Sequence, residues 1–203
     1  MSLSNWIRIR PDKVVVDGVE LQHDENGFAM LTEIYHKHIG DYPKFFKMDV
    51  TCKLGFVATE LLLQKENASR FVPCEDRVVI LFNRSGSLNA DTHYQATIQD
   101  KDNYFPSPAA FVYTLPNIVT GEIAIRNKYY GETSFIVLER FDVNVMARQI
   151  LCGFQNPETT SIIGGWNNCD DESHFDALLF ILSKSHDYTE ETLAKDILEI
   201  INY

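Results

Sequence analysis

Several signals are missing from this sequence of 203 residues, and each absence argues against a class of protein. The opening stretch MSLSNWIRIRPDK lacks an apolar core of signal-peptide length, and no run reaches the roughly 18 apolar residues that cross a bilayer. The four cysteines show no CxxC spacing, which predicts reduced thiols rather than a disulfide framework. We therefore expect a cytoplasmic protein without a membrane span.

Basic residues are also scarce. Lys and Arg together number 18 against 29 Asp and Glu, so the formal net charge is −11. Because binding to phosphates needs a basic face, this charge argues against a nucleic-acid partner and against an anionic membrane surface. The histidines form no compact ligand set, and the loop Asn83 to Ser87 lacks the phosphate-loop pattern. We expect neither a metal nor a cofactor.

Buried strands and amphipathic helices alternate along the chain. The runs VVILF, TSFIVLE and TTSIIGGWNNC are typical of buried strands, and WIRIRPDKVVVDGVEL predicts two short strands around a turn. KMDVTCKLGFVATELLL is the clearest helix, with Asp49 as N-cap, and YTEETLAKDILEIINY predicts a terminal helix capped by Thr189. SHFDALLFILSKS fits either a strand or a helix. We predict one α/β domain, residues 1–203, with a parallel or mixed sheet covered on both faces.

An ordered set of segments carries a family resemblance. YPKFFKMDVTCKLGFVATELLL is followed by VVILFNRSGSLNAD, then by FPSPAAFVYTLPNIVTGEIAIRNKYYGETSFIVLE, then by TTSIIGGWNNC. In this order, over about residues 42–170, the chain resembles the amino-terminal half of β-ketoacyl-acyl-carrier-protein synthases. The resemblance implies a thiolase-like half-fold, with a mostly parallel five-stranded sheet and helices on both faces.

The catalytic groups of that family have no counterpart here. In the family, the strand after a turn similar to GET leads to a cysteine at the amino end of a buried helix, where the helix dipole helps to activate the thiolate. Counted from Gly131, this position falls near Glu139 or Arg140, and neither side chain can form a thioester. The family's catalytic histidines belong to its carboxy-terminal half. His174 and His186 follow the last matched strand, and nothing in the sequence pairs them with a nucleophile.

The strand of the stretch TSFIVL has the strongest claim to an interaction. In thiolase-fold dimers, the corresponding strand pairs with its twin across the interface. An apolar strand buried by a partner and an ordinary central strand would have the same pattern, so both interpretations stay open. The predicted interface residues are Ser134, Phe135, Ile136, Val137 and Leu138.

The resemblance implies a ketosynthase-like protein without catalysis, acting as a partner in fatty-acid or polyketide biosynthesis of the polyene type. It would form a homodimer or pair with a ketosynthase, as chain-length factors keep the fold and lose the cysteine. Glu139 and Arg140 would then be a solvated strand end, rather than an ion pair at a pocket mouth.

Two alternatives remain. One is an acyl-thioester transferase or hydrolase whose active site cannot be placed; Cys169 is the thiol to test, although Asp170 and Asp171 should raise its pKa. The other is a module that binds acyl carrier protein. Because the carrier is acidic, this hypothesis needs a local basic patch. Its candidates are Arg8, Arg10, Lys44 and Lys47.

Overall fold

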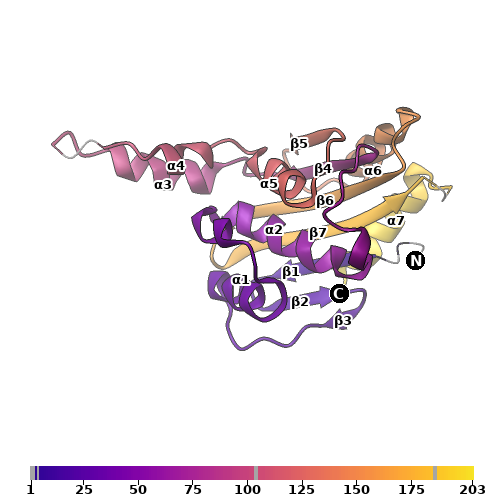
Figure 1. Cartoon of the computed structure of the whole chain (residues 1–203), viewed down its shortest axis with the longest axis horizontal. Coiled ribbons are helices and arrows are strands. Elements are labelled where there is room, and N and C mark those ends of the chain that lie inside the picture. The colour runs from indigo at the N-terminus through magenta and orange to yellow at the C-terminus, as the bar shows by residue number, and fades with distance from the viewer. Residues whose placement is uncertain (1–2, 4, 103–104, 185–186) are drawn as a thin grey trace.

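A seven-stranded mixed sheet runs through the described part of the chain (Figure 1). The computed structural model describes residues 3, 5–102, 105–184 and 187–203, so His186 lies outside the described residues. The strand order is β3-β2-β1-β7-β6-β4-β5. The strands are β1 (Trp6–Arg10), β2 (Lys13–Val16), β3 (Val19–Glu20), β4 (Arg77–Asn83), β5 (Thr133–Val137), β6 (Ser161–Asp171) and β7 (His174–Ser183).

The prediction of a mostly parallel, five-stranded sheet is wrong in strand number and direction. Only β4–β5 and β4–β6 are parallel pairs, whereas β1–β2, β2–β3, β1–β7 and β6–β7 are antiparallel. The long strand β7 explains the error. Helices cover both faces of the sheet, so this antiparallel strand is a continuous apolar run and lacks the alternation that normally reveals strand direction.

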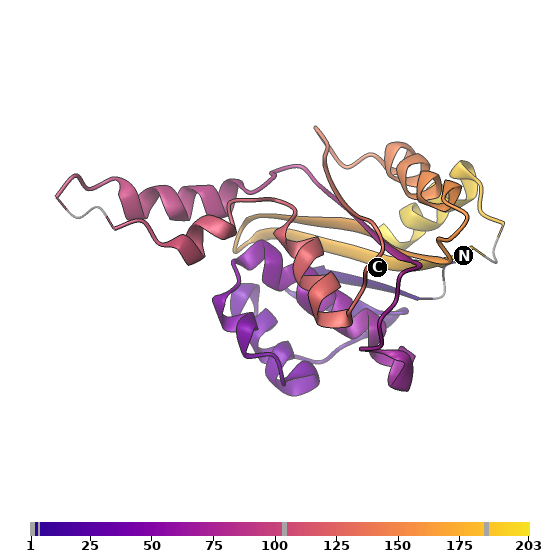
Figure 2. The same cartoon turned by 45° about the horizontal axis from the view of Figure 1, so that its top comes forward.

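Helices on both faces of the sheet were predicted, and the structure confirms them (Figure 2). One face carries α1 (Gly27–Ile34), α2 (Val50–Leu62) and α5 (Ile118–Asn127), and the other carries α6 (Val143–Cys152) and α7 (Glu190–Ile201). Shorter 3₁₀ or π turns span Tyr35–Ile39, Pro43–Lys47, Leu63–Ser69 and Gly153–Gln155. None of the helices in the described ranges is long and apolar enough to cross a membrane.

The predicted helix caps are present. The Asp49 carboxylate accepts hydrogen bonds from the backbone N–H groups of Thr51 and Cys52, each at 3.1 Å. Thr189 and Thr192 form a reciprocal capping box at the start of α7. These caps satisfy N–H groups that a helix start leaves without partners, and so fix where α2 and α7 begin.

A glycine allows the close approach of two helices on the first face. A Cβ atom on Gly55 of α2 would lie 2.5 Å from a methyl group of Val119 on α5. Any side chain at this position would therefore push α5 away from α2. The contact brings α5, and with it the start of β5, against the body of the molecule.

An arm (residues 88–102 and 105–112) projects beyond the end of the sheet (Figure 1). It contains α3 (Leu88–Ile98) and α4 (Pro108–Val112), and Ser107 caps α4. Ala90 is the buried residue of α3, and α4 has none. The arm therefore adds little to the hydrophobic core, and exposes Leu88, Phe105, Phe111 and Val112.

Candidate functional site

The carboxyl ends of β4, β5 and β6 lie together at one end of the sheet, because these strands pair in parallel. In open α/β sheets this end is the usual place for ligands. Three segments lie at this end of the sheet: the loop after β4, the turn after β6 and the junction of β5 with α6. They also contain the residues at which the sequence analysis placed the lost nucleophile.

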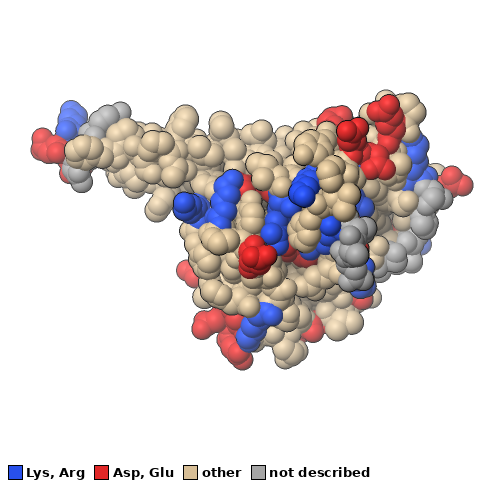
Figure 3. All heavy atoms as spheres, in the orientation of Figure 1, with Lys and Arg blue, Asp and Glu red and all other residues tan. Residues whose placement is uncertain are grey.

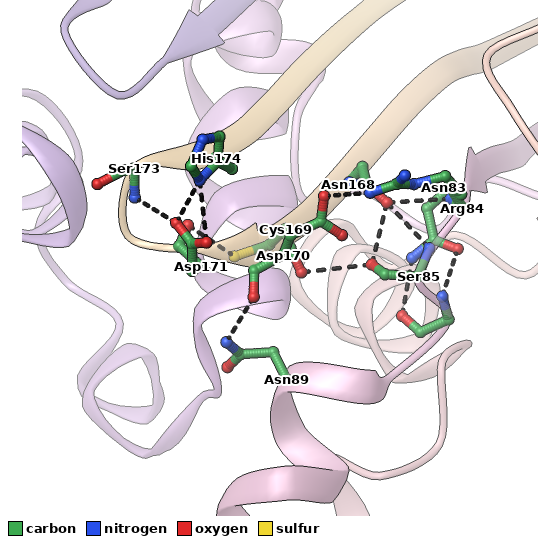
Figure 4. A network of polar contacts seen from close by, with 11 residues as sticks. Asn83, Arg84, Ser85, Asn89, Asn168, Cys169, Asp170, Asp171, Ser173 and His174 are labelled. Carbon is green, nitrogen blue, oxygen red and sulfur yellow. Dashed lines mark hydrogen bonds and ion pairs between the residues drawn. The ribbon is translucent and has the colours of Figure 1, made fainter.

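Two buried amides organise the loop after β4 (Figure 4). The side-chain oxygen of Asn168 accepts hydrogen bonds from the backbone N–H groups of Arg84 and Ser85, each at 3.0 Å. The side-chain oxygen of Asn83 accepts from the N–H of Gly86 at 3.0 Å, and its amide donates to the Gly86 carbonyl at 2.8 Å. Since these backbone N–H groups already have hydrogen-bond partners within the chain, the loop does not offer them to a phosphate group.

The turn after β6 carries charged groups but no reactive thiol. Arg84 pairs with Asp170 at 2.5 Å, and Nδ1 of His174 lies 2.9 Å from Asp171 at the exposed hairpin (Figure 4). Cys169 is buried, and burial raises its pKa to about 12, with Asp49 and then Asp170 as further causes. The predicted direction of this shift is confirmed, although burial rather than charge is its main cause. Cys169 is therefore a poor nucleophile.

The junction of β5 with α6 contains Glu139 and Arg140, near which the sequence analysis placed the former nucleophile. Glu139 and Arg140 are both exposed, and no ion pair joins them within the described residues. Asp142 caps α6 and accepts hydrogen bonds from the backbone N–H groups of Asn144 and Val145, each at 3.1 Å. The amino end of this helix is therefore occupied by a carboxylate of the chain itself.

An aromatic pair packs beneath this junction. Phe141 lies edge-on to Trp166 of β6, with ring centroids 5.1 Å apart and an interplanar angle of 73°. Both rings belong to the core between the sheet and the helices α6 and α7. The space between β6 and the start of α6 is thus filled by two large side chains.

The predicted interface residues lie on and just after β5, which is an edge strand. In the described part of the chain β5 pairs with β4 and has no second neighbour. Ser134, Phe135 and Ile136 are half-buried, Val137 is 52% exposed, and Leu138 is half-buried. None of these five side chains is fully buried, so the expectation of a buried strand is wrong for the isolated chain.

The basic residues proposed for carrier binding do not form one patch. Arg8 is buried and donates to the carbonyl of Ile201 and to Asp176, on the side of α7. Arg10 also reaches the end of the chain, at the carbonyl of Tyr203. Lys44 and Lys47 belong to the turn Pro43–Lys47, which packs on the opposite face of the sheet.

Lys and Arg side chains nevertheless gather over the middle of the face that α2 and α5 cover (Figure 3). Buried carboxylates neutralise several of them. Lys44 pairs with Glu122 at 2.5 Å, and Glu60 binds both Arg70 at 2.5 Å and Arg126 at 3.5 Å. This band therefore carries less free positive charge than its surface suggests.

Comparison with solved structures identifies the fold. The chain superposes on the ishigamide ketosynthase/chain length factor with a TM-score of 0.64 and 15% identity, over 90% of this chain and 62% of that one. The chain has a ketosynthase-like, thiolase-type fold. A ketosynthase (ApeO) in complex with its chain length factor (ApeC) from Xenorhabdus doucetiae matches with a TM-score of 0.58 and 10% identity, over 91% and 79% of the two chains.

A third match is a type II polyketide synthase acyl-carrier protein in complex with its ketosynthase (AntDE:AntF). It has a TM-score of 0.58 and 10% identity, and covers 91% of this chain and 62% of that one. The chain thus spans less than two thirds of the ishigamide and AntDE:AntF chains. No known protein family and no curated protein matches its sequence. At these identities the likeness establishes the fold alone.

The sequence analysis missed the amides that shape this site. Asn83 and Asn168 are almost completely buried, as is Asn167, whose amide donates to the Thr51 carbonyl at 3.1 Å. A usable signal was present, because asparagines ended two otherwise apolar strands. Buried polar side chains need partners, so such asparagines indicate a local hydrogen-bond network.

Proposed function

We propose that the chain is a non-catalytic, ketosynthase-like subunit. It pairs through β5 with a second copy or with an authentic ketosynthase, in polyketide or fatty-acid-like biosynthesis. The observation that carries this proposal is the open edge of β5, an apolar strand with no partner on one side among the described residues. The names of the similar structures, which include complexes of a ketosynthase with a chain length factor, support the same role.

The junction after β5 supports the absence of catalysis. Condensation by this family would need a nucleophile at the amino end of α6, and Asp142 caps that end instead. Phe141 and Trp166 fill the space below it. A carboxylate at this position would also oppose the negative charge that develops when a thioester reacts.

We further propose that residues 1–203 form one domain that is stable by itself. Helices α6 and α7 cover one face of the sheet and contribute Met146, Ile150, Leu193 and Ile197 to its core. The other face is covered by α1, α2 and α5. Because neither face is left bare, a second half-fold is not needed to bury the sheet.

Intact-protein mass spectrometry after incubation with malonyl- and acyl-thioesters tests the catalytic part. We expect no covalent adduct, while an authentic ketosynthase treated in parallel becomes acylated. An acyl adduct would contradict the proposal and support the transferase or hydrolase alternative. Cys152, at the carboxyl end of α6, is the exposed thiol and the first position to examine for such an adduct.

An acyl carrier protein is a second proposed partner. Lys44 and Lys47 are the exposed members of the predicted basic set, and both lie in the turn Pro43–Lys47. Changing both to Glu should abolish measurable carrier binding in a titration, whereas Arg148→Glu on α6 should not. Equal binding by the double variant and the unchanged protein would remove these lysines as the docking site.

A further inference from the structure

A cavity of about 400 Å³ lies between the root of the arm and the body of the molecule. Phe28 of α1 and Val50 of α2 line it from the body, and Ala90 and Ala110 line it from the arm. Its volume is within the range of pockets that bind small molecules. None of its lining residues belongs to β5 or to the junction with α6.

Small side chains on the arm keep this cavity open. Ala90 of α3 and Ala109 and Ala110 of α4 all face it, and each ends at Cβ. Phe28 stacks on Phe175 of β7, with ring centroids 5.7 Å apart, and so forms a fixed aromatic wall on the body side. The result is a mainly apolar slot between Phe28 on the body and three alanines on the arm, with polar side chains at its margins.

Tyr113 supplies a hydroxyl group without a partner. Its side chain is 8% exposed and lines the cavity, and its hydroxyl makes no hydrogen bond within the described part of the chain. Burial, followed by the nearby Cys52 and Glu122, raises its pKa, so the hydroxyl stays protonated at neutral pH. Because the hydroxyl oxygen is accessible from the cavity and is not sealed in the core, a ligand with a hydroxyl or carbonyl group can bond to it in place of water.

The charges around the cavity do not favour an ion. Lys47 and Asp49 both line it and have opposite signs. The carboxylate of Asp49 is already bonded to the N–H groups of Thr51 and Cys52, which occupies the amino end of α2. Of the remaining groups that could bond a ligand, Tyr113 and Asn89 are uncharged, and His93 is exposed.

From this combination we infer that the cavity binds a neutral amphiphile, with its linear or flat apolar part between the alanines and Phe28. Its hydroxyl or carbonyl end would bond to Tyr113. This inference goes beyond the proposed subunit role and does not depend on it. Binding in the cavity and pairing through β5 can therefore succeed or fail separately.

Three probes with the same chain and different ends test the ligand class: octan-1-ol, octanoate and octylammonium. Calorimetric or ligand-observed NMR titration of the full chain should give saturable binding with one site for the alcohol, and at least tenfold weaker binding for both ions. Saturable binding of an ion with equal or higher affinity would overturn the ligand class. No saturable binding of any probe would overturn the site.

Filling the slot tests the location. Ala110→Phe, and Ala109→Phe as a second filler from the same helix, should weaken alcohol binding at least tenfold. Ala29→Phe is the matched control, because Ala29 is exposed on α1 and does not line the cavity. Unchanged affinity in both filled variants, with the fold checked by circular dichroism, would contradict the location.

Tyr113→Phe tests the hydrogen bond with little change in shape. We expect the affinity for octan-1-ol to fall about fivefold. The affinity for 1-fluorooctane, which has no hydroxyl group to bond, should not change. An equal loss for both probes would show that the ring alone matters and would overturn the role of the hydroxyl.

Discussion

The two edges of the sheet differ in ways that bear on function. At one edge, β3 has two residues, and its Glu20 pairs with Lys13 of β2 at 3.5 Å. At the other edge, β5 has five residues, TSFIV, without a charge. Short length and charge are the usual protections against unwanted strand pairing. The β3 edge has both protections and the β5 edge has neither, which favours β5 as the edge that meets a partner.

The backbone hydrogen bonds of β5 show which of its residues point their N–H and C=O groups to the open edge. The carbonyl of Glu132 accepts from Val79 at 3.0 Å, and the N–H of Leu138 donates to Asn83 at 2.8 Å. Because bonding direction alternates along a strand, Ser134 and Ile136 also face β4. Thr133, Phe135 and Val137 therefore turn their N–H and C=O groups to the open side.

The largest expected effect comes from a charge on the open edge. Val137→Lys should weaken pairing by about a hundredfold, because a charge would be buried at an apolar interface. Val19→Lys is the matched control, since Val19 is an exposed valine on β3. Analytical ultracentrifugation over a dilution series measures both. Equal dissociation constants for the two variants would contradict the claim that pairing uses the β5 edge and not the β3 edge.

A proline substitution should have a smaller effect on pairing, and it tests the contribution of the backbone hydrogen bonds alone. Val137→Pro removes an N–H that points to the open side and leaves the bonds to β4 in place, so pairing should weaken about tenfold. Glu20→Pro removes an N–H from the β3 edge and should leave pairing unchanged. The same dilution series applies. A normal dissociation constant for Val137→Pro would mean that β5 meets its partner through side chains only.

The smallest expected effect separates the β5–α6 junction from the open edge. Asp142→Ala removes the cap of α6 and should lower the free energy of unfolding by about 1 kcal/mol in urea titration. Pairing should stay the same, because among the described residues Asp142 bonds only to its own helix. Asn144→Ala, at an exposed neighbour, should change stability by less than about 0.5 kcal/mol. Loss of pairing in Asp142→Ala would place the junction within the interface.

Local signals in the sequence were sufficient for much of the fold. Asp49 and Thr189 were identified as caps because each precedes a helical pattern of apolar residues, and both are caps in the structure. The strand at Arg77 to Phe82 was also located correctly. Helix caps and hydrophobic periodicity depend on residues that are close together in the sequence, so they can be recognised from a single sequence.

Features that depend on distant residues could not be predicted. Strand order and the direction of β7 depend on which apolar segments pair in the folded chain. A segment such as β7 that is apolar on both faces does not reveal its neighbours or its direction in the sequence. The exposure of β5 is also a property of its place at the edge, since Phe135 and Ile136 would have the same pattern in the centre of a sheet. Likewise, Asn83 and Asn168 indicate buried hydrogen bonds near two strand ends, but their positions in the sequence do not show that both bind the same loop.

Amide hydrogen exchange, resolved by residue, tests the central claim most directly. In the assembled protein, formed with itself or with a ketosynthase, the outward N–H groups of Thr133, Phe135 and Val137 should be protected as strongly as those of Ser134 and Ile136. The N–H of Glu20 on β3 should stay unprotected. The account is contradicted if the three outward amides of β5 exchange as fast as Glu20 in every complex, or if the chain remains a monomer with both candidates.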